Sequence, residues 1–224
     1  MRNTLMLTLA VVAIVLSGSA AYAQEPRAYV EGTAGFSTLT GGGGTTGNTT
    51  GEIGIRVAPR VVVFGNVGRM RDAQSSALQS SFTDALTALA ANDLTATGTM
   101  RTPAWYSLGG ARIALTNRSA ITPYVLGAVG FAHLAPSARF LYNSGTTLNG
   151  NIAAAGDDIT SDVVANGFFT TPATTTGLML RTGGGVQVPL GRHLLGNVGY
   201  TVSRISADTP LHAQDLSFGL GIKF

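Results

Sequence analysis

Few residues in this sequence have types and spacings that could support chemistry. Gly42, Gly44 and Gly47 match the G-x-G-x-x-G fingerprint of dinucleotide-binding proteins. That fingerprint needs a preceding strand and a following helix within a parallel-sheet unit, and the Gly/Thr-rich surroundings predict neither. The sequence also contains no P-loop and no G-x-S-x-G nucleophile motif. We therefore interpret residues 42–47 as part of a flexible loop.

Oxygen-bearing side chains gather between residues 157 and 162. Asp157, Asp158 and Asp162, together with Thr160 and Ser161, could supply the hard oxygen ligands that calcium prefers. The alternative interpretation is a solvated polar loop. Because the chain has no cysteine, disulfides and thiolate-ligated metals are excluded. We expect no cofactor and no dedicated metal site.

The composition differs from that of an ordinary soluble domain. Of the 224 residues, 45% are hydrophobic and only 11% are charged, against about 25% charged residues in typical soluble domains. The formal net charge is +3, and the basic residues form no cluster. We therefore expect no nucleic-acid partner.

The first 23 residues are organised like a secretory signal peptide. Arg2 gives a positive start, residues 5–16 are apolar, and Ala21-Tyr22-Ala23 fits an A-x-A cleavage site. The apolar stretch is shorter than the roughly 20 residues of a transmembrane helix, which disfavours a membrane anchor. We expect a signal peptide over residues 1–23 and one mature domain over residues 24–224.

The last ten residues alternate strictly between two kinds of side chain. Leu216, Phe218, Leu220, Ile222 and Phe224 are apolar, and every residue between them is polar or glycine. A period of two indicates a strand with one apolar and one polar face.

Two short motifs repeat along the chain. A motif of glycine, apolar, polar and apolar residues begins at Gly54, Gly110, Gly185 and Gly221. A second motif, apolar-Gly-Asn/Ala-Val-Gly, spans residues 64–68, 126–130 and 195–199. Turn signals at residues 58–60, 116–119 and 189–192 separate the paired motifs. With a first strand around residues 27–36, the count reaches eight strands.

The connections between these strands are asymmetric, because short turns alternate with longer segments. Outer-membrane barrels have short periplasmic turns and long external loops. We therefore predict an all-β fold: an eight-stranded antiparallel up-and-down transmembrane β-barrel, with both termini on the periplasmic side.

Each long loop has its own character. We expect a mobile first loop over residues 38–50 and an amphipathic helix in the second, over residues 71–99. The third loop, residues 135–175, shows little periodicity, and residues 207–214 predict a tight hairpin.

If Phe224 faces lipid, the alternation places no charge toward lipid at mid-depth, where a charge costs a few kcal/mol. The lumen is then predicted to hold a polar cluster of Glu31, Glu52, Arg56, Arg112, Arg181, Asp215 and Lys223. Glu31 and Glu52 are the expected partners of Arg56 and Arg112, because they come from neighbouring strands. This cluster predicts either a sealed polar plug or a narrow conduit with a preference for anions. A bulge at Gly109-Gly110 would exchange the faces of Trp105 and Tyr106.

The sequence resembles the small bacterial outer-membrane β-barrel domain superfamily, which includes the OmpA-type transmembrane domain, OmpW-like and opacity-type surface proteins. The resemblance rests on the signal peptide and on residues 121–130 and 183–193, and it covers nearly the whole mature chain. It implies an integral protein of the bacterial outer membrane. The terminal strand, with Leu216, Phe218, Leu220, Ile222 and Phe224, resembles the family's assembly signal, which the barrel-insertion machinery reads.

Barrel esterases similar to lipid A deacylases carry a lipid-side histidine with a serine two residues later. The histidines here, His133, His193 and His212, are followed at that position by Ala135, Leu195 and Gln214. We therefore predict a non-enzymatic protein with a structural or surface-interaction role through its external loops. The alternative is a narrow pore, or an OmpW-like route for small or hydrophobic molecules. The expected partners are outer-membrane lipid and lipopolysaccharide, whose phosphates Arg69 and Arg204 could contact; the sequence does not specify a loop ligand.

Overall fold

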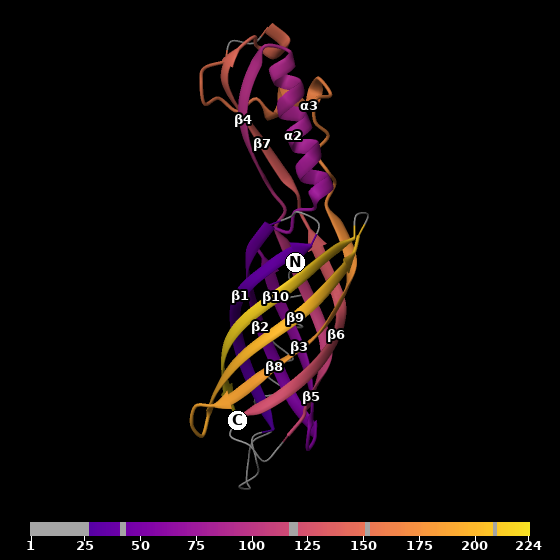
Figure 1. Cartoon of the computed structure of the whole chain (residues 1–224), viewed down its shortest axis with the longest axis vertical. Coiled ribbons are helices and arrows are strands. Elements are labelled where there is room, and N and C mark those ends of the chain that lie inside the picture. Colours follow the sequence, from indigo (N-terminus) through magenta and orange to yellow (C-terminus); the bar gives the residue numbers. More distant parts are fainter. Residues whose placement is uncertain (1–26, 41–43, 117–120, 151–152, 208–209) are drawn as a thin grey trace, which may run out of the picture.

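The computed structural model describes residues 27–40, 44–116, 121–150, 153–207 and 210–224. The predicted signal peptide and its cleavage site lie outside these residues. Eight strands form a closed antiparallel barrel in the order β1-β10-β9-β8-β6-β5-β3-β2 (Figure 1). The barrel strands are β1 (Ala28–Thr40), β2 (Gly44–Ala58), β3 (Val61–Met70), β5 (Ala104–Ala114), β6 (Thr122–Leu134), β8 (Thr175–Pro189), β9 (Leu194–Ser206) and β10 (Leu211–Lys223). The predicted fold class is confirmed.

Closure brings the two ends of the barrel sequence together. β1 pairs with β10 from Tyr29↔Lys223 to Thr40↔His212, in an unbroken antiparallel register. Every barrel strand therefore has a partner on both sides, which removes the free sheet edges that a membrane interior does not tolerate. No helix in the described part of the chain is long and apolar enough to cross a membrane.

The outer wall of the barrel is apolar, as the alternation predicted. Large exposed side chains from every barrel strand point outward, among them Val30, Ile55, Val63, Ile113, Val129, Leu180, Val198 and Leu220. Phe36, Trp105, Phe131 and Tyr200 are the exposed outward aromatic residues expected for a girdle. β5 pairs with β3 and β6 without a register shift at Gly109-Gly110, so Trp105 faces outward and Tyr106 inward.

The first loop differs from its prediction. β1 and β2 continue as a paired hairpin up to Leu39↔Gly44, so most of residues 38–50 are strand. The threonines of this segment are β-branched and suit a strand, whereas we expected a mobile loop from the glycine content.

The second and third loops fold together above one end of the barrel (Figure 1). The predicted helix is present as α2 (Ser76–Ala91), and Ser75 caps it by accepting a hydrogen bond from the Leu78 N–H. The sequence did not predict the hairpin-like sheet of β4 (Leu94–Arg101) and β7 (Ser137–Gly145), nor η1 (Leu148–Gly150) and α3 (Thr160–Ala165). We call α2, β4, β7, η1 and α3 with their connections the external domain.

Candidate functional site

One buried guanidinium organises the periplasmic half of the lumen. Arg112 of β5 is 4% exposed, and its Nη2 lies 2.7 Å from Glu52 Oε1 while its Nη1 lies 3.8 Å from Glu31 Oε2. The guanidinium carbon also lies 4.4 Å from the centroid of the Tyr124 ring. The structure thus joins Arg112 to both glutamates, in what we call the Arg112 cluster.

Neutral side chains complete the Arg112 cluster. Tyr29 and Asn66 donate hydrogen bonds to the two oxygens of Glu52, at 2.5 and 3.3 Å. Asn197 donates to Glu31 and accepts a 2.9 Å hydrogen bond from the Tyr124 hydroxyl. Buried carboxylates that are hydrogen-bonded as well as ion-paired lose less free energy on leaving water.

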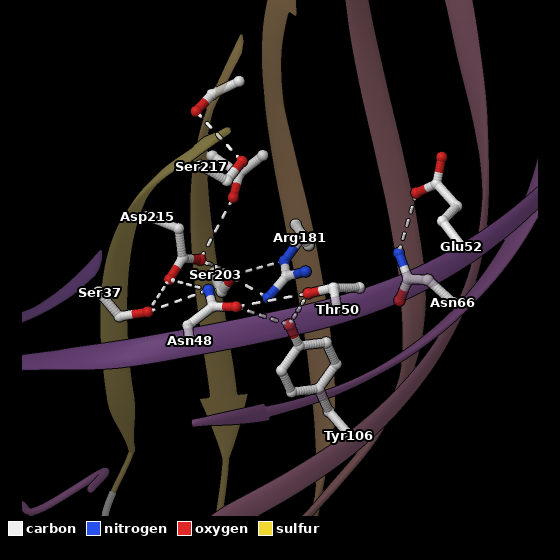
Figure 2. Close-up of polar contacts among 12 residues, drawn as sticks. Ser37, Asn48, Thr50, Glu52, Asn66, Tyr106, Arg181, Ser203, Asp215 and Ser217 are labelled. Carbon is white, nitrogen blue, oxygen red and sulfur yellow. Dashed lines mark hydrogen bonds and ion pairs between the residues drawn. The ribbon is translucent and has the colours of Figure 1, made fainter. Parts of the chain in front are cut away.

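A second cluster surrounds Asp215 (Figure 2). Ser37 and Asn48 donate to one oxygen of Asp215, and Thr201 and Ser203 donate to the other, each at 3.2 Å. Arg181 places its Nη2 3.6 Å from Asp215 and donates from Nε to Ser203 at 2.9 Å. We call this network the Asp215 cluster.

Two of the seven predicted cluster residues lie elsewhere. Arg56 is exposed and Lys223 half-buried, and both line the pocket at the periplasmic mouth, below the Arg112 cluster. The prediction that Glu31 and Glu52 pair with Arg56 as well as Arg112 is therefore corrected in favour of Arg112. Alternation gives the face of a residue but not its height along the barrel axis, which depends on strand tilt and stagger.

Inward glycines make room for inward tyrosine rings. Tyr106 on β5 is the cross-strand partner of Gly68, and a Cβ at Gly68 would lie 2.3 Å from the Tyr106 ring. Tyr29 and Gly54 form the same kind of pair between β1 and β2. Aromatic rings therefore occupy the space beside these two glycines.

An apolar layer closes the external end of the lumen. Met70, Met179 and Ile205 are fully buried there, and Leu39, Leu134 and Leu211 are nearly so. Buried apolar side chains thus lie between the two polar clusters and the external side. The lumen prediction was purely polar and did not include this layer.

The external domain has a hydrophobic core of its own. Phe82 from α2, Phe140 from β7 and Phe169 after α3 bring their ring centroids within 4.9–6.1 Å of one another. Phe140 is fully buried, and Gly98 of β4 leaves room for Phe82, since a Cβ there would lie 2.6 Å from its ring. Two loops far apart in the sequence therefore share one core.

The loop aspartates have structural hydrogen bonds. Asp158 accepts from the hydroxyl and N–H of Thr160 and from Arg139 Nε at 2.8 Å, and these contacts, the Thr160 ones foremost, hold the pKa of its carboxyl below the usual range. Asp157 accepts from the Ala154 N–H. No group of three or more potential metal-ligating His, Cys, Asp or Glu residues occurs within the described residues.

The histidines do not converge. His133 Nδ1 lies 2.9 Å from Thr176 Oγ1 on the outer wall, and His193 Nδ1 lies 3.3 Å from the Lys223 carbonyl at the periplasmic end. His212 is exposed near the external end of β10. The three histidines therefore do not form a shared metal site.

The predicted membrane-facing residues lie on the outer wall. Leu216, Phe218, Leu220, Ile222 and Phe224 are all exposed along one face of β10. Arg69 and Arg204 are exposed near the external ends of β3 and β9, and the Arg69 guanidinium carbon lies 5.1 Å from the Trp105 ring centroid.

The sequence matches the family model described as "Outer membrane protein beta-barrel domain" over residues 7–224. The chain belongs to this family. It is therefore an integral protein of the bacterial outer membrane. No relative among curated proteins matches its sequence.

Solved structures share the fold at low sequence identity. Neisserial surface protein A of Neisseria has a TM-score of 0.54 and 14% identity, covering 88% of this chain and 97% of its own. Ail, the attachment invasion locus protein of Yersinia pestis, has a TM-score of 0.49 and 12% identity, covering 90% and 100%.

Proposed function

We propose that this barrel is a non-enzymatic anchor that presents the external domain for interaction at the cell surface. The observation that carries the proposal is the shared core of the second and third loops. Flexible loops would need no buried aromatic trio, whereas a surface that recognises a partner gains from a rigid support.

The exposed face of the β4–β7 sheet is the surface we propose for contact. One face of the sheet packs its apolar side chains on the helices. The opposite face exposes mainly hydroxyl, amide and guanidinium groups from Thr95, Thr97, Thr99, Arg101, Ser137, Arg139 and Asn143. Its composition suits a polar partner recognised by hydrogen bonds.

The proposal is tested by adhesion of bacteria that display the protein. Surfaces coated with mucin, collagen or sulfated glycan would be compared, together with cell–cell aggregation. Replacing residues 72–102 and 136–174 by short turns should abolish any adhesion that the full protein confers, while the barrel still folds. Thr97→Glu should weaken it, and Thr83→Glu on the exposed side of α2 should not. Adhesion that survives removal of the external domain would contradict the proposal.

Transport is the second candidate function, and one pocket favours transport of small hydrophobic molecules. A cavity of about 300 Å³ near the rim of the barrel is lined by Leu78, Leu134, Pro136, Pro172 and Leu211. Leu134 and Leu211 also belong to the apolar layer, so a small hydrophobic molecule could rest there. Below that layer, the charged side chains of the Arg112 and Asp215 clusters oppose the passage of a hydrophobic molecule. Conductance in planar bilayers and uptake of a labelled alkane would distinguish transport from anchoring.

We infer that lipopolysaccharide is a partner of the outer wall. Arg69→Gln should reduce lipopolysaccharide retained on the purified protein by roughly tenfold, because it removes charge-assisted hydrogen bonds to phosphate. Trp105→Ala should act in the same direction without a charge change, since the indole positions Arg69. Combining Arg204→Gln with either substitution should reduce the retained lipopolysaccharide further. Arg101→Gln in the external domain is the control. Equal retention in all four variants would contradict this inference.

We infer that β10 carries the assembly signal for the barrel-insertion machinery. Phe224→Ala should lower the outer-membrane level of the protein and leave unfolded chains in the periplasm. Phe131→Ala is a matched control, because it removes the same ring from the outward face of β6, away from the terminal strand. Quantitative blotting of membrane and periplasmic fractions gives the result. Equal levels for the two variants would argue against a terminal signal.

A further inference from the structure

A pocket of about 160 Å³ opens at the periplasmic end of the barrel, and its lining is strongly basic. Arg27, Arg56, Arg60, Arg112 and Lys223 contribute to this pocket, which we call the basic vestibule. Within the described residues, no Asp or Glu lines it. Its volume is below the about 300–1,000 Å³ of sites for drug-sized ligands, so a compact ligand fits better.

Two side chains that line the vestibule carry buried donors without a hydrogen-bond acceptor. Arg112 Nε and Gln187 Nε2 are buried and make no hydrogen bond among the described residues, and both side chains line the pocket. Both atoms are N–H donors, and a buried donor left without an acceptor is unfavourable. The vestibule therefore lacks carboxylates, and an anion would supply acceptors together with negative charge.

The vestibule ends at the Arg112 cluster. Glu52 and the Tyr124 ring hold the Arg112 guanidinium in place at 2.7 and 4.4 Å, and a separate cavity of about 50 Å³ lies beyond it. Glu31, Glu52 and Asp215 line that inner cavity and would repel an anion that moved further in. The apolar layer closes the external end. The vestibule is thus a blind pocket, suited to binding and not to conduction.

We propose that the basic vestibule binds a compact oxyanion of the phosphate class from the periplasmic side. Guanidinium groups match the geometry of phosphate oxygens and donate paired hydrogen bonds to them. A cleft lined by charges of one sign and walled by low-dielectric material also concentrates counter-ions. The phosphate could belong to a small periplasmic solute or to the headgroup of an anionic lipid in the inner leaflet.

The test uses the folded protein in a phosphate-free maltoside detergent. Inorganic phosphate is titrated by calorimetry, and a short-chain phosphatidylglycerol is tested by native mass spectrometry. Arg60→Gln and Gln187→Leu, made separately, should each weaken binding by roughly tenfold or more. Gln187→Leu keeps the charge constant. It therefore distinguishes binding through specific hydrogen-bond donors from non-specific electrostatic attraction. Arg192→Gln is the matched charge control, because Arg192 is exposed on the periplasmic β8–β9 turn and does not line the vestibule.

Binding of either probe that depends on Arg60 and Gln187 supports the proposal, and the probe that binds identifies the source of the phosphate. Mobility on gels before and after boiling verifies that each variant is folded. Absence of binding by both probes overturns the proposal. An equal loss in Arg192→Gln and Arg60→Gln, with no change in Gln187→Leu, also overturns it, because binding would then reflect overall charge alone.

Discussion

Replacing Arg112 by methionine should lower the free energy of unfolding of the barrel by about 3–5 kcal/mol. The substitution keeps much of the side-chain volume but leaves Glu52 and Glu31 buried, at 8% and 1% exposure, without their cation. Urea titration of the folded protein in lipid vesicles measures the effect. Adding Glu52→Leu to Arg112→Met should recover part of the loss, because one stranded carboxylate is then removed.

Arg139→Met is the control for this prediction. Arg139 pairs with Asp158 in the external domain, where the two side chains are 62% and 45% exposed. Exposed ion pairs contribute only about 0–1 kcal/mol. Arg56→Met should also have a small effect, since Arg56 is exposed at the periplasmic mouth. A loss in Arg139→Met as large as in Arg112→Met, or the absence of coupling to Glu52, would show that the Arg112 cluster does not stabilise the barrel.

The sequence was sufficient to predict the barrel because its signals are local. Strict alternation over residues 215–224 indicates a strand and assigns its two faces. The repeated glycine-led motifs and the turn signals between them give the strand number and the side of the short connections. Each of these features lies within a few residues of the chain, so no knowledge of distant contacts was needed.

Heights along the barrel axis could not be predicted in the same way. Arg56 and Arg112 both follow a glycine in the same repeated motif, yet one is exposed at the mouth and the other is buried. Both are in register with Val62 of β3, so their difference in height comes from the tilt of the strands, which closure of the whole barrel determines. The position of Tyr106 also depended on whether β5 contains a bulge, which only its pairing with β3 and β6 decides.

The external domain escaped prediction because its pairing is non-local. α2 was predictable, since Leu78, Phe82, Leu86 and Leu89 recur at helical spacing. β4 pairs with β7 across the entire β5–β6 hairpin, from Leu94↔Gly145 to Arg101↔Ser137. From its sequence alone, a short threonine-rich segment such as β4 is predicted to be a loop, because its partner strand is not known.

Replacing Phe140 by alanine should unfold the external domain and leave the barrel closed. Phe140 is fully buried between Phe82 and Phe169, with ring centroids at 4.9 and 5.4 Å, and truncating a core phenylalanine costs about 3–5 kcal/mol. A loss of that size exceeds the stability expected for a small domain with a single aromatic core. Limited proteolysis of the protein in vesicles should then cut residues 72–102 and 135–174.

The barrel provides the internal reference for this experiment. Its strands are joined by continuous hydrogen-bonded pairing, and none of the external-domain core residues belongs to a barrel strand. Gel mobility of the Phe140→Ala protein should therefore still change on boiling. Val164→Ala on the exposed side of α3 is the control and should leave proteolysis unchanged. If Phe140→Ala abolished barrel closure as well, the external domain and the barrel would fold as one cooperative unit. The external domain could then not be replaced or removed without unfolding the barrel.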